Sequence, residues 1–146
     1  MPSKTTRVVL AEDNKAVRKG IKRFLNKAPE IEVVGEAEDG VAALQLVDEL
    51  LPDLLVLDVE MPRLNGIEVA KQLKKSRIKT RILVLSAYDD KEYIQSMLAN
   101  GVSGYLIKDE APERILEAVR GVALGETGWV SPPVKARLNN TKAKRS

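Results

Sequence analysis

The chain has 146 residues, and its apolar content of 44% is enough for the core of one compact domain. It contains no Cys and no His, which excludes disulfides and thiolate or imidazole metal ligands, so oxygen atoms would have to hold any metal, as suits Mg²⁺ or Ca²⁺. The net charge is +3, and no apolar stretch approaches the roughly 20 residues of a membrane-spanning helix, so we expect a cytoplasmic protein without membrane contact.

Runs rich in Val, Ile and Leu recur along the chain, and four of the five are almost continuous rather than alternating. Continuous apolar runs are typical of strands buried on both faces of a sheet, which favours parallel strands. The runs cover residues 7–11, 31–37, 54–59, 81–86 and 104–108.

After each run, apolar residues recur at the spacing of amphipathic helices. Asn14, Asp39 and Asn65 are suited to cap helix starts, and Pro112 fits a first helical turn. The apolar positions are Val17, Ile21, Phe24 and Leu25; Leu44, Val47 and Leu51; Ile67, Ala70 and Leu73; Ile94, Met97 and Leu98; and Ile115, Val119 and Val122.

Strands and helices therefore alternate as (βα)₅, and right-handed crossovers fold such a chain into a doubly wound sheet with helices on both faces. We predict an α/β fold whose five parallel strands have the flavodoxin-like order 2-1-3-4-5. In that order the switch point, where ligands bind, lies between the first and third strands. These strands end at Glu12-Asp13 and at Asp58. The acidic residues thus fall where the topology places a ligand.

Polar residues at the strand ends suggest phosphoryl chemistry. Glu12, Asp13 and Asp58 would repel one another unless a cation held them together, and Mg²⁺ is suited to that role. Asp58 beside the ion can attack phosphorus, because carboxylates form aspartyl phosphates. Lys108 offers an ammonium, and Ser86 a hydroxyl, to the oxygens of the resulting phosphoryl group.

Four segments carry a family resemblance: the Glu12-Asp13 pair, residues 58–66 (DVEMPRLNG), Ser86-Ala87 and residues 104–109 (GYLIKD). Together they resemble the receiver domain of two-component response regulators. The likeness implies the receiver fold over residues 5–125. Residues 121–138 also resemble the end of receivers in the NarL/FixJ (LuxR-type) class.

The resemblance implies a phosphorylation site at Asp58, loaded by a partner sensor histidine kinase with Mg²⁺. The metal would be held by Asp13, Asp58 and the backbone carbonyl of Glu60, with Glu12 contacting a water on the metal. The implied protein is a signalling switch rather than an enzyme, with at most slow autodephosphorylation.

The resemblance also implies the switch that reads the phosphoryl group. Lys108 matches the family's phosphate-binding lysine, and Ser86 and Tyr105 match the pair in which the hydroxyl moves toward the phosphoryl group while the ring turns inward. Asp109 stands where many receivers have Pro after the Lys, often with a cis bond. A non-proline cis bond costs about 2.5 to 4 kcal/mol, so we expect a trans bond here.

Residues 126–146 are rich in Gly, Pro, Asn and Lys and are predicted to form a flexible linker or tail. Segment 131–146 holds five of the 24 basic residues and no acid, which leaves 19 against 21 acidic residues and a net charge of −2 for the rest. In the NarL/FixJ class such a linker leads to a helix-turn-helix domain that controls transcription, and this chain ends before one. We therefore expect no sequence-specific DNA binding by the chain itself.

The helical pattern around residues 111–123 has a wider apolar stripe than packing on a sheet requires, which favours a phosphorylation-dependent homodimer through that helix. Besides Ile115, Val119 and Val122, the stripe includes Leu116, Ala118 and Ala123.

Two other functions use similar parts. A haloacid dehalogenase-like phosphatase also combines a strand-end Asp nucleophile with Mg²⁺, a hydroxyl and a Lys, but it needs Asp-x-Asp, and position 60 is Glu. A flavodoxin-like mononucleotide site needs a phosphate-binding loop after the first strand, where Glu12-Asp13 would repel phosphate. The spacing favours the receiver.

Overall fold

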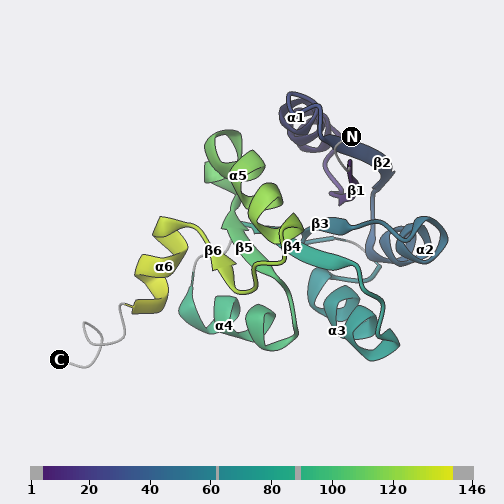
Figure 1. The fold of residues 1–146 in the computed structure, drawn as a ribbon. Helices are drawn as coiled ribbons and strands as arrows, with labels where there is room; N and C mark the ends of the chain where they lie inside the picture. The colour runs from purple at the N-terminus through teal and green to yellow at the C-terminus, as the bar shows by residue number, and fades with distance from the viewer. Residues whose placement is uncertain (1–4, 62, 88–89, 140–146) are drawn as a thin grey trace.

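The computed structural model describes residues 5–61, 63–87 and 90–139. Strands and helices alternate through it as expected (Figure 1). The elements are β1 (Thr6–Ala11), α1 (Lys15–Leu25), β2 (Ile31–Ala37), α2 (Gly40–Leu50), β3 (Leu54–Asp58), α3 (Gly66–Ser76), β4 (Arg81–Ser86), α4 (Lys91–Ala99), β5 (Gly104–Ile107), the 3₁₀ turn η1 (Lys108–Glu110), α5 (Ala111–Ala123), β6 (Trp129–Val130) and α6 (Pro132–Asn139).

The sheet is parallel, and its order is β2-β1-β3-β4-β5-β6. The predicted order 2-1-3-4-5 and the doubly wound fold are confirmed. The predicted number of strands is corrected from five to six, because β6 pairs with β5 through Gly104 opposite Trp129 and Tyr105 opposite Val130. A strand of two residues is too short to produce the apolar run by which the other five were predicted.

Two apolar layers enclose the sheet. One contains buried residues of α1 and α5, and the other contains buried residues of α2, α3, α4 and α6. Figure 1 shows α1 and α5 on one side of the row of strands, and α2, α3 and α4 on the other. All five residues of β3 are buried, as expected for a central strand covered on both faces. Asp58 ends this strand and is therefore held by the most protected part of the sheet.

The predicted helix caps are confirmed. The side chains of Asn14, Asp39 and Asn65 each accept a hydrogen bond from the backbone N–H three residues later, at distances of 3.0, 2.8 and 3.0 Å. Asn14 follows Glu12-Asp13 directly, and Asn65 ends the loop that follows Asp58. These caps fix where α1 and α3 begin, and so they fix the two loops that carry the acidic residues.

The segment predicted as a flexible linker contains β6 and α6 in its described part. Val134 of α6 is fully buried, and it belongs to the same apolar cluster as Ile94 and Met97 of α4. Figure 1 shows α6 beside α4 at the edge of the sheet. The predicted linker or tail of residues 126–146 thus contains a short strand and a helix within residues 129–139, while residues 140–146 lie outside the described part.

The helix of residues 111–123, predicted as a dimer face, buries most of its apolar stripe within the chain. Ile115, Ala118, Val119 and Val122 are each at most 1% exposed, and Leu116 packs against the same cluster. The stripe is wide because α5 contacts both the sheet and α1, so its width no longer argues for a homodimer.

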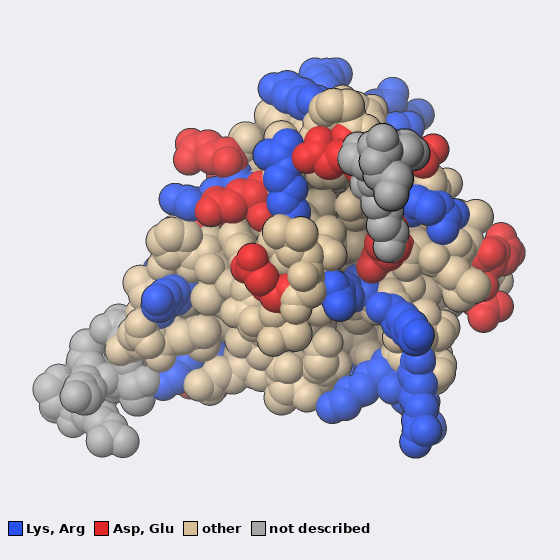
Figure 2. Space-filling model, viewed as in Figure 1, with Lys and Arg blue, Asp and Glu red and all other residues tan. Residues whose placement is uncertain are grey.

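Figure 2 shows Lys and Arg interspersed with Asp and Glu over the upper part of the face it presents, whereas the lower part of that face is mainly uncharged apart from Lys and Arg. Among the helices of the described residues, none is long and apolar enough to cross a bilayer.

Candidate functional site

Asp58 lies at the carboxyl end of β3 and is 2% exposed. The strand places it opposite Leu85 of β4, in the interior of the sheet rather than at its edge. Its Oδ1 accepts a hydrogen bond of 3.3 Å from the backbone N–H of Glu60. This bond fixes the start of the loop after β3, in which the exposed Glu60 was predicted to offer its carbonyl to a metal.

Glu12 and Asp13 lie directly after β1, the strand that pairs with β3. Carboxylate oxygens of Glu12, Asp13 and Asp58 lie within 4.8 Å of one another. Glu12 is 1% exposed, and its Oε2 accepts a hydrogen bond of 3.0 Å from the backbone N–H of Asn14, whereas Asp13 is exposed. The adjacent strand ends therefore bring the three predicted carboxylates together, two of them buried and one open to solvent.

Lys108, the residue after β5, reaches this acidic cluster from across the sheet. Its Nζ lies 2.8 Å from Oε1 of Glu12 and 3.2 Å from Oδ2 of Asp58. The ammonium thus bridges the two buried carboxylates, which is the placement predicted for the lysine that contacts a phosphoryl group on Asp58.

Burial governs the electrostatics of this cluster. It raises the pKa of Glu12 from 4.5 to about 7, against the opposing contact with Lys108. Burial also raises the pKa of Asp58, again opposed by Lys108. Burial would lower the pKa of Lys108, but its contacts with Glu12 and Asp58 outweigh that effect and raise it. One ammonium therefore compensates three carboxylates incompletely, and a further cation would be bound favourably.

The donor set fits magnesium. Three carboxylates from two neighbouring strand ends offer only oxygen, and the exposure of Asp13 leaves room for the waters that Mg²⁺ retains. The residues that would hold the ion are those predicted from the sequence: Asp13, Asp58 and the carbonyl of Glu60, with Glu12 nearby.

Ser86 and Tyr105 are both fully buried. Ser86 ends β4 opposite Ile107, and Tyr105 lies on β5 opposite Val84, two pairs further from the rim. The structure already holds the Tyr105 ring inside, in the cluster that includes Ile94, Met97 and Val134. The predicted inward turn of the Tyr105 ring on phosphorylation stays a prediction. The sequence prediction did not anticipate that α6 would contribute to the cluster around Tyr105.

Sequence reasoning missed Arg18. This residue of α1 is 8% exposed, and its guanidinium donates a hydrogen bond of 2.8 Å to the backbone carbonyl of Glu12 and one of 3.2 Å to Glu36. The signal was available, because Arg18 stands three and seven residues before the buried Ile21 and Leu25. An Arg on the buried side of a helix needs a polar partner in the interior, and here that partner is the backbone carbonyl of Glu12 in the acidic cluster.

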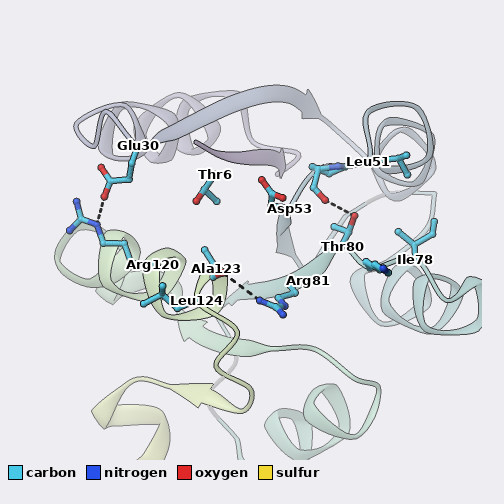
Figure 3. A pocket seen from close by; sticks show the side chains of 12 residues that line it. Thr6, Glu30, Leu51, Asp53, Ile78, Thr80, Arg81, Arg120, Ala123 and Leu124 are labelled. Carbon is cyan, nitrogen blue, oxygen red and sulfur yellow. Dashed lines mark hydrogen bonds and ion pairs between the residues drawn. The ribbon is translucent and has the colours of Figure 1, made fainter. Parts of the chain in front are cut away.

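Pro62 and Tyr88, which flank the site in sequence, lie outside the described residues. A hollow of about 860 Å³ lies at the opposite end of the sheet, beside the first residues of β1 and β4 (Figure 3). Leu51 and Leu124 line it and are 63% and 82% exposed. None of the predicted site residues lines this hollow, so it is separate from the acidic cluster.

Comparison with known proteins gives consistent matches. The response regulator receiver domain family matches residues 8–120. The nitrate/nitrite response regulator protein NarL of Escherichia coli (strain K12) is 39% identical over 139 residues, which cover 93% of this chain and 64% of that protein. The transcriptional regulatory protein DegU of Brevibacillus brevis is 38% identical over 131 residues, covering 90% of this chain and 55% of that protein.

A solved structure agrees with these relatives. The signal receiver domain of a NarL response regulator from Mycobacterium tuberculosis has a TM-score of 0.82 and 37% identity, and it covers 85% of this chain and 100% of that chain. The chain spans little more than half the length of the curated relatives it matches, from 55% to 64% for the two named above.

Proposed function

Because the chain belongs to the response regulator receiver domain family, a module of phosphorylation-dependent two-component signalling, we propose that Asp58 is its phosphoryl acceptor. The predicted family resemblance is thereby confirmed, and the matches give no support to the haloacid dehalogenase-like alternative. The observation that carries the proposal is the placement of Asp58 at the end of β3, within reach of two further carboxylates and 3.2 Å from the ammonium of Lys108.

The transfer step follows from these contacts. A carboxylate oxygen of Asp58 attacks the phosphorus of a phosphohistidine on a partner kinase, the P–N bond breaks, and the electron pair leaves with the imidazole nitrogen, which takes up a proton. The donor histidine lies outside these 146 residues, which include no His. The product is an acyl phosphate on Asp58.

Mg²⁺, held by Asp13, Asp58 and the carbonyl of Glu60, would supply the positive charge that the transferring phosphoryl group requires. Lys108 bridges Glu12 and Asp58 before transfer, and its ammonium then contacts a phosphoryl oxygen. Ser86, at the neighbouring strand end, donates its hydroxyl to another oxygen, and Tyr105 packs behind it. In these roles the residues of the acidic cluster accept and respond to a phosphoryl group, and they are not proposed to turn over a substrate.

The change caused by phosphorylation would act on other proteins through residues outside the acidic cluster. We propose a sensor histidine kinase as the donor, and control of transcription as the output, because the relatives named above are response and transcriptional regulators. Sequence-specific DNA binding by this chain is not expected, since α6 is a single short helix and a helix-turn-helix unit needs two packed helices with a recognition face. A homodimer through α5 keeps the status of a prediction.

The proposal is tested by incubating the protein with phosphoramidate and Mg²⁺ and measuring its intact mass. We expect the addition of one phosphoryl group to wild type, none to Asp58→Asn, and one to Asp48→Asn, a matched control in which an exposed carboxylate of α2 is removed. Equal labelling of Asp58→Asn and wild type would refute the assignment.

A further inference from the structure

Glu110 connects the turn that carries Lys108 to the last part of the described chain. It ends the 3₁₀ turn η1, two residues after Lys108. Its Oε2 accepts two hydrogen bonds, one of 3.1 Å from the backbone N–H of Ile107 and one of 2.6 Å from the hydroxyl of Ser131. Its Oε1 pairs with Nε of Arg114 at 3.4 Å. One carboxylate oxygen of Glu110 therefore binds both Ile107, at the end of β5, and Ser131, which lies 21 residues after Glu110 in the sequence.

Ser131 connects α6 to the rest of the fold. It is fully buried and lies between β6 and α6. Its Oγ accepts a bond of 3.4 Å from the N–H of Val134, and its carbonyl accepts one of 2.8 Å from the N–H of Lys135. Ser131 therefore caps α6 while it donates its hydroxyl proton to Glu110. Val134, one turn further, packs beside α4.

We propose that the bond between Glu110 and Ser131 is a latch that transmits the state of Lys108 to α6. The inference rests on the proposed role of Lys108 in binding the phosphoryl group. Before transfer, Lys108 is anchored on Glu12 and Asp58, and η1 holds Glu110 against Ser131. Contact with a phosphoryl group redirects Lys108 and displaces the short turn of which it is the first residue.

The geometry makes the latch sensitive to such a displacement. The O–H···O⁻ bond of 2.6 Å has the length of a strong charge-assisted bond, so a shift of the turn that lengthens it also weakens it. Only three residues separate Ile107 from Ala111, and Oε2 of Glu110, which binds Ser131, also accepts from the N–H of Ile107. We therefore expect η1 to move as a unit. Phosphorylation is therefore expected to loosen α6 from β5 and α4, which exposes the surface that α6 covers.

Amide hydrogen exchange of residues 134–139 measures this coupling, and the emission of Trp129, the single Trp of the chain, gives a second readout from the adjacent strand. In wild type, Mg²⁺ with beryllofluoride is expected to speed α6 exchange about tenfold, the effect of losing one hydrogen bond to a charged group. In Glu110→Ala and Ser131→Ala, exchange is expected to be fast already and to change little on loading.

Two further variants separate the latch from general destabilisation. Glu110→Gln retains a carbonyl oxygen that accepts from both Ile107 and Ser131, so the response of α6 is expected to persist. Arg114→Ala removes only the ion pair with Oε1, and its response should also resemble wild type. If loading with beryllofluoride still speeds α6 exchange tenfold in Glu110→Ala, the latch is refuted. It is also refuted if this response is lost in Arg114→Ala but kept in Glu110→Ala.

The latch and the proposed function fail in distinguishable ways. Loading of Asp58 is followed by mass or by ¹⁹F resonance, and if Asp58 loads while α6 exchange stays unchanged, the latch is refuted and the function stands. Lys108→Ala tests the latch without any phosphoryl group: it should speed α6 exchange when Glu110 is present and have no added effect in Glu110→Ala. Equal effects in both backgrounds would refute the coupling even if Asp58 proves not to be the acceptor.

Discussion

Replacing Lys108 by Met tests how the acidic cluster is held together. The variant keeps the aliphatic stem but removes the ammonium that lies 2.8 Å from Glu12 and 3.2 Å from Asp58, both nearly inaccessible to solvent. Removing one partner of a buried ion pair costs roughly 3 to 5 kcal/mol. Lys108 keeps 26% of its side-chain surface exposed, and solvent screening reduces the expected loss of unfolding free energy to about 2 kcal/mol.

For a chain of this length that loss lowers Tm by about 4 to 8 °C. The assay is thermal and urea unfolding without divalent ions, with Lys74→Met as the matched control, since Lys74 is exposed and its ammonium donates to a backbone carbonyl, that of Ala99. Mg²⁺ should restore part of the lost stability, because it supplies positive charge to the same carboxylates. A Lys108→Met protein as stable as wild type in Mg²⁺-free buffer would refute the account of the cluster.

Three other outcomes follow from the same geometry. Asp13→Ala is expected to abolish Mg²⁺ binding measured by calorimetry, and unchanged affinity would place the metal elsewhere. Arg18→Ala leaves the carbonyl of Glu12 without its donor and should cost about 2 kcal/mol in urea unfolding; an effect no larger than that of the more exposed Lys22→Ala would contradict this. The pKa of Glu36 is lowered, chiefly by Lys22, so its contribution to stability is present above the unfolded pKa near 4.5 and is lost as pH falls through the folded pKa. Glu36→Gln should therefore lose less stability than wild type on acidification, and parallel pH profiles would refute this.

The sheet and the acidic cluster could be predicted because each depends on a simple physical rule. Strands buried on both faces need continuous apolar runs, and their parallel alignment brings all carboxyl ends to one rim. Residues far apart in sequence, such as Asp13 and Lys108, were therefore expected at one site before any distance was known. The Asn and Asp caps were predictable for a similar reason, because first-turn N–H groups need acceptors.

The region after α5 could not be predicted in the same way. Trp129 and Val130 form a strand too short for periodicity, and Pro132-Pro133 read as linker residues although Pro also suits the first turn of a helix. This region is ordered by the pairing of β6 with β5, by the buried Val134 and by the hydrogen bond from Ser131 to Glu110. Contacts of this kind depend on tertiary structure and leave no local pattern in the sequence.

The helix α5 shows a second limit of sequence patterns. Its broad apolar stripe suggested a partner, but the second neighbour of the stripe proved to be α1 of the same chain. Sequence periodicity gives the width of an apolar face without indicating what covers it. The same periodicity gave no indication that Val134 of α6 would pack in the cluster that encloses Tyr105.

The most direct test of the central claim is to locate the acyl phosphate. The protein is loaded with acetyl phosphate and Mg²⁺, reduced with borohydride, which converts an acyl phosphate to the alcohol, and mapped by peptide mass spectrometry. The account predicts a single reduced carboxyl at Asp58, the strand-end residue in contact with Lys108. Reduction at Glu12, at Asp13 or at any other carboxyl in place of Asp58 would contradict it.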